Sequence, residues 1–274
     1  MGQLPETLGG GAGSWPVRTR AWLNGALPFA ARTPAALTDM IPESIIGDDD
    51  RTVEVDTTGI PQRLVASLTI RSSTGARFYG TGWLASARCV LTCGHCVHDQ
   101  QMGGMAASIE VVPGLSGTNR PFGTFQAVGF DAHPAWKASA DRAYDLGFIL
   151  LGERVGQSLG HFAIGQMPPN GALTGQPLLC AGYPLFDGGH SWQLSGVGTA
   201  KLVSGNRLFH DVDTENGTSG GPVWLANGPP GPPTAVAVHA YEKEALPGGG
   251  TANSGTAITP ENYATIQGWI AAHP

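Results

Sequence analysis

The sequence predicts an all-β protein. Three observations favour this class: Gly (41 residues) and Pro (21 residues) are plentiful among 274 residues, only 13% of the residues are charged, and short apolar runs recur between turn residues. This composition is typical of short strands joined by many turns, whereas long helices need fewer breaks. Strands of this length and spacing form barrels or sandwiches.

The expected strands begin after an irregular first segment. Residues 1–44 read as a separate segment, because the glycines at 9–11 and five scattered prolines interrupt any periodic pattern. The apolar runs that follow predict strands at 64–70, 78–84, 89–92, 109–112, 122–128, 146–151, 177–181, 191–203, 208–212, 222–225 and 235–239.

One helix is predicted, at the end of the chain. Thr259 or Pro260 opens it, and residues 261–272 carry apolar side chains at helical spacing. We expect this helix to pack on the outside of the last barrel.

Charge and hydropathy exclude several classes of function. The net charge of −6 supplies no basic footprint for nucleic acid. No apolar run is long enough to span a membrane, and the first thirty residues lack the pattern of a signal peptide. Four cysteines, Cys89, Cys93, Cys96 and Cys180, are too few for a disulfide scaffold, so they do not decide the compartment.

Three separate segments carry the residues that nucleophilic catalysis requires. Ser219 lies among glycines, where the chain can turn sharply and the amides of Gly217 and Ser219 can point at one oxyanion. His95 follows a strand and could act as the base. Asp145 precedes an apolar strand, where burial would let it orient the imidazole.

At these residues the sequence resembles the chymotrypsin-like serine proteases, and among them the bacterial glutamyl endopeptidases of the staphylococcal V8 and Bacillus type. Histidine, aspartate and serine stand in the family's order, and the similarity runs from Ile45 to Trp269. The motifs that carry it are Ile45–Thr52, Gly80–Trp83, Asp145–Gly147, Gly182–Pro184, Ser191–Gln193, Asp213–Thr214 and Val238–His239.

The resemblance implies two six-stranded antiparallel Greek-key β-barrels followed by a C-terminal α-helix, with the catalytic triad His95, Asp145 and Ser219 in the cleft between the barrels. It implies a first barrel within 45–160 and a second within 161–274. Thr214 and His239 match the residues that contact an acidic side chain at P1, which predicts cleavage after Glu or Asp. Glu242, part of a stretch that departs from the relatives, would repel such a side chain.

The resemblance also implies a zymogen, since Ile45 matches the start of the mature relatives and residues 1–44 would be a pro-segment. Cys96 has a counterpart in many relatives whose partner position is Gly80 here, which leaves Cys89, Cys93 or Cys180 as possible substitutes. We expect protein or peptide substrates, no cofactor, no metal, secretion and a monomer.

Alternative interpretations of the same residues stay open. A protease-like fold without activity could serve as a binding module. Cys93 and Cys96 form a C-x-x-C pattern of the kind found in thiol–disulfide oxidoreductases, and with His98 they could bind zinc, although no fourth ligand is evident. The glycines around Ser219 also fit the nucleophile elbow of α/β-hydrolases, but only His239 and His273 follow the serine.

Overall fold

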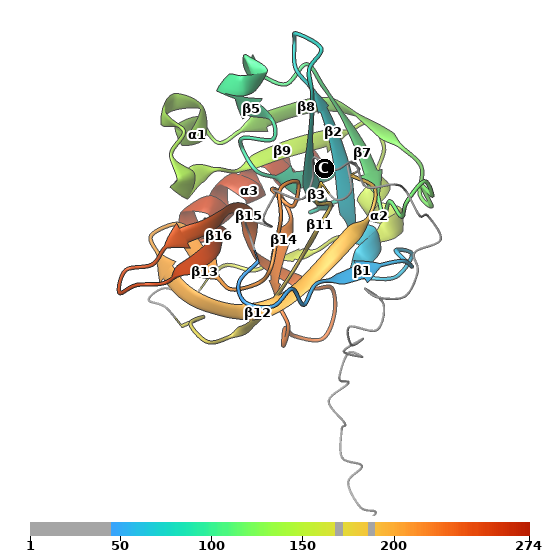
Figure 1. The fold of residues 1–274 in the computed structure, drawn as a ribbon. Helices are drawn as coiled ribbons and strands as arrows, with labels where there is room; N and C mark the ends of the chain where they lie inside the picture. Colours follow the sequence, from blue (N-terminus) through green and yellow to red (C-terminus); the bar gives the residue numbers. More distant parts are fainter. Residues whose placement is uncertain (1–44, 168–171, 186–189) are drawn as a thin grey trace, which may run out of the picture. The chain divides into compact units, whose positions relative to one another are not determined.

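The computed structural model describes residues 45–167, 172–185 and 190–274 (Figure 1). The predicted separate segment 1–44 lies outside these residues. In the described part of the chain no helix is long and apolar enough to cross a membrane.

Six antiparallel strands close the first barrel, in the order β2-β3-β4-β9-β8-β7. Its interior is filled by side chains with no exposed surface, among them Leu68, Trp83 and Ile149. The strands are β2 Val65–Arg71, β3 Arg77–Leu84, β4 Cys89–Thr92, β7 Ser108–Pro113, β8 Phe125–Ala132 and β9 Gly147–Leu151.

A second ring of six antiparallel strands follows, in the order β12-β11-β14-β15-β16-β13, and pairing of β13 with β12 closes it. Two short strands add to its rim: β1 Thr52–Glu54 pairs with β12, and β10 Ala163–Ile164 pairs with β15. The predicted pair of six-stranded barrels is confirmed. The ring consists of β11 Pro177–Gly182, β12 Gln193–Ser204, β13 Arg207–His210, β14 Pro222–Leu225, β15 Thr234–Ala245 and β16 Thr251–Ala257.

The predicted C-terminal helix α3, Pro260–Ala272, is confirmed. Its first turn contacts the second barrel, where Asn206, between β12 and β13, donates to Glu261 Oε2 at 3.2 Å. The Trp269 ring lies 5.0 Å from the ring of Phe148, which belongs to β9 of the first barrel. The helix therefore reaches back to the first barrel, where aromatic faces are available for its apolar stripe. Shorter helical elements and one small hairpin lie between the strands: α1 Pro134–Ser139, α2 Val155–Leu159, η2 Gln62–Leu64, η3 Gln100–Met102, η4 Arg142–Tyr144, β5 His98–Asp99 and β6 Gly104–Met105.

Strand β16 was not predicted from sequence. Asn253, Ser254 and Thr256 within it are polar yet completely buried, so the strand lacks the apolar alternation that marks a half-buried strand. A Cβ at Gly255 would overlap the main chain at Val238, which shows how closely β16 approaches β15.

Candidate active site

His95 stands in the tight turn that follows β4. Its main-chain N–H donates to Asp145 Oδ1 at 2.8 Å, and its ring Nδ1 lies 2.7 Å from Asp145 Oδ2. Gly94 makes this turn possible, because a Cβ there would lie 2.6 Å from the Trp136 ring. Two bonds to one carboxylate fix the imidazole, and with Nδ1 directed at Asp145 the opposite nitrogen, Nε2, points elsewhere.

Asp145 is fully buried just before β9, and three hydrogen bonds compensate for its burial. The third donor is the hydroxyl of Tyr241 in β15, at 2.5 Å from Oδ2. Burial by itself would raise the pKa of Asp145, but His95 and Tyr241 reverse the effect, so the pKa lies below its ordinary value. The carboxylate therefore stays ionised.

The same pairing acts on His95 in the opposite direction. Burial favours the neutral ring, yet the charge of Asp145 outweighs burial and raises the pKa of His95 well above its ordinary value. One quarter of the imidazole surface stays exposed. A base of this kind can take up a proton from a neighbouring group and hold it as an imidazolium ion.

The loop that carries Ser219 is docked on the first barrel. The Ser219 carbonyl accepts a hydrogen bond from Thr81 N at 2.8 Å in β3, and the Cys96 thiol, next to His95, donates to the same carbonyl at 3.7 Å. Gly217 and Gly220 have φ values of +96° and +92°, which side chains rarely adopt. Within the described residues, Ser219 Oγ has no hydrogen bond, and neither do the amides of Gly217 and Ser219.

Both residues predicted to contact P1, Thr214 and His239, are buried beside this loop. His239 exchanges main-chain hydrogen bonds with Gly220 and Gly221, at 2.8 and 2.9 Å, which ties β15 to the serine. Its Nδ1 lies 3.4 Å from His210 Nε2, while its Nε2 is buried without a hydrogen-bond partner among the described residues. Burial, with His210 and His95 nearby, lowers the pKa of His239 well below its ordinary value.

Three residues in this region escaped the sequence analysis. Tyr241 donates to Asp145, His210 faces His239, and Asn253 donates to Thr214 Oγ1 at 3.1 Å. Tyr241 directly precedes Glu242, in the stretch that departs from the relatives. Asn253 lies in the unpredicted strand β16, so no sequence signal pointed to it.

All four cysteines are free and buried. Of the alternatives left open for them, a local disulfide is therefore not formed. Cys96 Sγ faces Gly80, where an added Cβ would lie 2.8 Å from the sulfur, and Cys93 donates to the His239 carbonyl at 3.0 Å. In the part of the chain that the structure describes, the only group of three close metal-ligand atoms belongs to Cys93, His95 and Asp145, so His98 does not complete the zinc site considered above.

A histidine–aspartate pair in the first of two barrels, with a hydrogen bond from Tyr241 of the second, defines a class of two-barrel hydrolase. Comparison with known proteins supports this class directly: residues 80–229 match the trypsin-like peptidase domain. The chain belongs to the trypsin-like peptidase family and is a serine-type endopeptidase.

Two individual relatives are similar over most of the chain. The chain is 33% identical over 231 residues to a glutamyl endopeptidase of Bacillus licheniformis, covering 83% of this chain and 69% of the relative. It is 31% identical over 229 residues to a Bacillus subtilis protein named extracellular metalloprotease, covering 83% and 70%.

Solved structures share the architecture. A Glu endopeptidase determined in complex with MPD superposes with a TM-score of 0.71 at 26% identity, over 83% of this chain and 99% of that chain. The protease Anisep of Arthrobacter nicotinovorans shares the fold at a TM-score of 0.61 and 19% identity, over 78% and 96% of the two chains.

Proposed function

We propose that this endopeptidase hydrolyses peptide bonds through Ser219 as nucleophile, His95 as general base and Asp145 as the group that orients His95. The observation that carries the proposal is the double hydrogen bond between His95 and the buried Asp145 carboxylate. With Nδ1–H held by Asp145, Nε2 is the nitrogen left to accept a proton from Ser219.

In the first step Ser219 Oγ attacks the scissile carbonyl while its proton passes to His95. The carbonyl oxygen becomes an oxyanion, for which the amides of Gly217 and Ser219 are the available donors. His95 then protonates the leaving amine, and water hydrolyses the acyl-enzyme by the same route in reverse.

Labelling with a fluorophosphonate followed by mapping of the modified residue tests these roles. We expect modification at Ser219, loss of labelling in His95→Ala, and unchanged labelling in His98→Ala, which removes the neighbouring histidine. A protein that folds but is not labelled would be a binding module, the second interpretation of this fold, and labelling at a cysteine would favour thiol chemistry.

We infer that the P1 pocket accepts an acidic side chain. His239 Nε2 is a buried polar atom without a partner among the described residues, and such an atom is costly unless a ligand supplies one. Thr214 is held in place beside it by Asn253. The named Glu endopeptidase relatives support the same preference.

Peptides that differ only at P1 test the preference. We expect the highest kcat/KM with Glu and a loss of about tenfold or more in the Glu-over-Phe ratio for His239→Asn, because one buried hydrogen bond to a charged group is removed. Glu242→Gln should raise the ratio, because it removes a negative charge in the same strand as His239. Better cleavage after Phe or Arg by the unchanged protein would contradict the inference.

We also propose that residues 45–160 and 161–274 form the two barrel domains. Removal of residues 1–44 would activate the protein. Ile46 N donates to Asp213 Oδ1 at 2.7 Å, next to Thr214, so a chain end created at Ile45 would lie close to the pocket. Higher kcat/KM for a protein beginning at Ile45 than for the full chain is the expected result, and equal values would contradict it. We also propose that the enzyme is a monomer and works outside the cell, and the name of the extracellular Bacillus subtilis relative supports the second point.

A further inference from the structure

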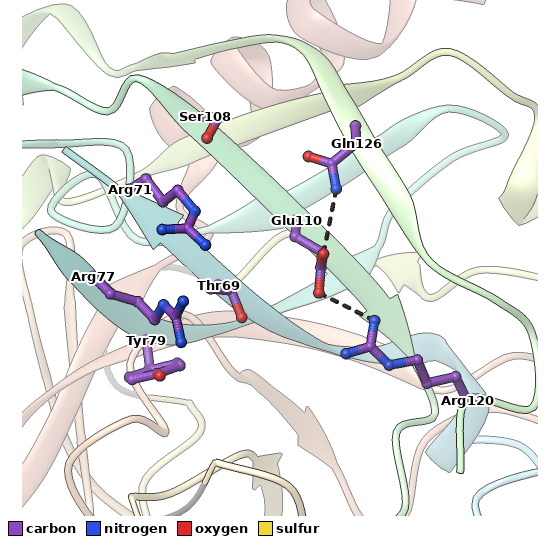
Figure 2. A pocket seen from close by; sticks show the side chains of 8 residues that line it. All are labelled: Thr69, Arg71, Arg77, Tyr79, Ser108, Glu110, Arg120 and Gln126. Carbon is purple, nitrogen blue, oxygen red and sulfur yellow. Dashed lines mark hydrogen bonds and ion pairs between the residues drawn. The ribbon is translucent and has the colours of Figure 1, made fainter. Parts of the chain in front are cut away.

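We propose that a basic pocket on the outer face of the first barrel binds carboxylates from an acidic stretch of the polypeptide substrate while the scissile bond lies at Ser219. The inference rests on the peptidase function proposed above. The pocket has a volume of about 330 Å³, and none of the proposed catalytic or P1 residues lines it. Its principal residues are Thr69, Arg71, Arg77, Tyr79, Glu110 and Arg120 (Figure 2).

Strand register brings these residues onto one face. Arg71 in β2 lies directly opposite Arg77 in β3, and Thr69 lies opposite both Tyr79 in β3 and Glu110 in β7. Residues two apart along a strand face the same side of a sheet. In Figure 2 the guanidinium groups of all three arginines point inward, toward Thr69 and Glu110.

The charges in this pocket do not balance. Glu110 is its one carboxylate, and it already accepts hydrogen bonds from Arg120 at 3.2 Å and from Gln126 at 3.4 Å. Within the described residues Arg71 and Arg77 have neither an ion pair nor a side-chain hydrogen bond. Two positive charges therefore face each other across adjacent strands without a counter-charge.

Like charges directly opposite in a sheet are destabilising, and an anion between them would remove the repulsion. Two guanidinium groups offer the fork geometry that matches carboxylate oxygens in paired hydrogen bonds. The chain as a whole has a net charge of −6. An acidic peptide would therefore be attracted to this positive pocket and not to the rest of the surface.

The pocket lies along the same strand as the residues that dock the serine loop. Thr81 N binds the Ser219 carbonyl, and Arg77 lies four residues earlier in β3, about 13 Å along an extended strand. Tyr79, at the pocket's edge, packs its ring 5.1 Å from that of His190, whose Nε2 contacts the Gly80 carbonyl at 2.9 Å. An extended substrate leaving the cleft would reach the arginines within about four residues.

Matched peptides test the inference. One pair has an unchanged scissile segment extended on its C-terminal side by a run of D-Glu or a run of D-Gln, and a second pair is extended on the N-terminal side. The D-residues keep the charge but add no bond that the proposed preference for Glu at P1 would cleave. We expect kcat/KM at low salt to be about tenfold higher for the D-Glu run on one of the two sides, with the difference shrinking at high salt. In Arg71→Gln/Arg77→Gln the ratio should fall to about one.

The control variant Arg154→Gln/Lys201→Gln removes two exposed positive charges outside the pocket, so its ratio should match that of the unchanged protein. Turnover of the unextended peptide by every variant tests the proposed peptidase function separately. Equal ratios in the unchanged protein and the pocket variant would overturn the inference, as would an equal fall in the control. Inorganic phosphate that binds the pocket in a titration while the peptides show no difference would identify a site for free anions, which also overturns it.

Discussion

His95 and His239 lie within reach of each other's charge, yet the two barrels place them in opposite environments. His95 faces a carboxylate, which raises its pKa, whereas His239 faces a second imidazole, His210, which together with burial lowers its pKa. Both histidines lie near the loop that carries Ser219, but the group that each ring faces sets the direction of its pKa shift. The His95 ring is equipped to take up a proton, whereas the His239 ring stays neutral.

The largest expected effect concerns the partner of His95. Asp145→Asn should lower kcat about 10⁴-fold, because the amide no longer holds the imidazole in the tautomer that accepts the serine proton. Steady-state kinetics on a short peptide measure this loss. Asp131→Asn is the control, since Asp131 binds Lys137 at the surface, and its kcat should be unchanged. Similar losses in both variants would show that Asp145 has only a structural role.

The next effect concerns stability, to which His210 and His95 contribute with opposite dependence on pH. Burial lowers the pKa of His210 to about 4, so between pH 6.5 and 4 the unfolded chain binds a proton that the folded chain excludes. The resulting loss of unfolding free energy on acidification is about 3 kcal/mol for this one group. His95 opposes it, because a raised pKa contributes stability below pH 6.5 that is lost as the pH rises through the folded value.

Urea unfolding at several pH values measures this difference. We expect His210→Asn to flatten the decline between pH 6.5 and 4, whereas replacing the exposed His161 by Asn should leave its slope unchanged. A decline of the same steepness in the His210 variant would mean that other groups cause the acid lability.

The smallest effect concerns Tyr241, which positions Asp145 from the other barrel. Tyr241→Phe keeps the ring under the Arg142 guanidinium, 4.4 Å away, but removes the hydrogen bond to Asp145. We expect kcat/KM to fall about tenfold. The acid limb of its pH profile should move to higher pH, because a carboxylate with one donor fewer attracts the His95 proton more strongly.

Tyr144→Phe provides the matched control. Its hydroxyl also donates to a carboxylate, that of Glu261, at 3.1 Å, but this pair lies apart from His95. The pH profile should be unchanged in this variant. A profile that stays in place for Tyr241→Phe as well would reduce Tyr241 to a packing residue.

Sequence patterns anticipated the barrel strands best where a short apolar run is bounded by turn residues, as in β4, which is buried along its whole length. They also placed His95 and Asp145 in segments that the structure joins by two hydrogen bonds. The roles assigned to Ser219, Gly217, Thr214 and His239 stay predictions.

Tyr241, Asn253 and the contact of α3 with the first barrel were not predictable in the same way. Tyr241 and Asp145 are 96 positions apart in the sequence, and they meet only because the two barrels pack against each other. Asn253 is buried because Thr214 and the Val212 carbonyl satisfy its amide, a compensation that composition does not reveal. The contact between Trp269 of the helix and Phe148 joins residues far apart in the sequence, so no local pattern predicts it.

The hydrogen bond from Thr81 N to the Ser219 carbonyl means that one barrel helps to position the proposed nucleophile, which the other barrel carries. Any loosening between the barrels would shift the serine while each barrel still keeps its own interior. On heating, the rate of turnover should accordingly fall at a lower temperature than the circular dichroism signal of the strands. The reaction rate is then the more sensitive measure of the contact between the two barrels.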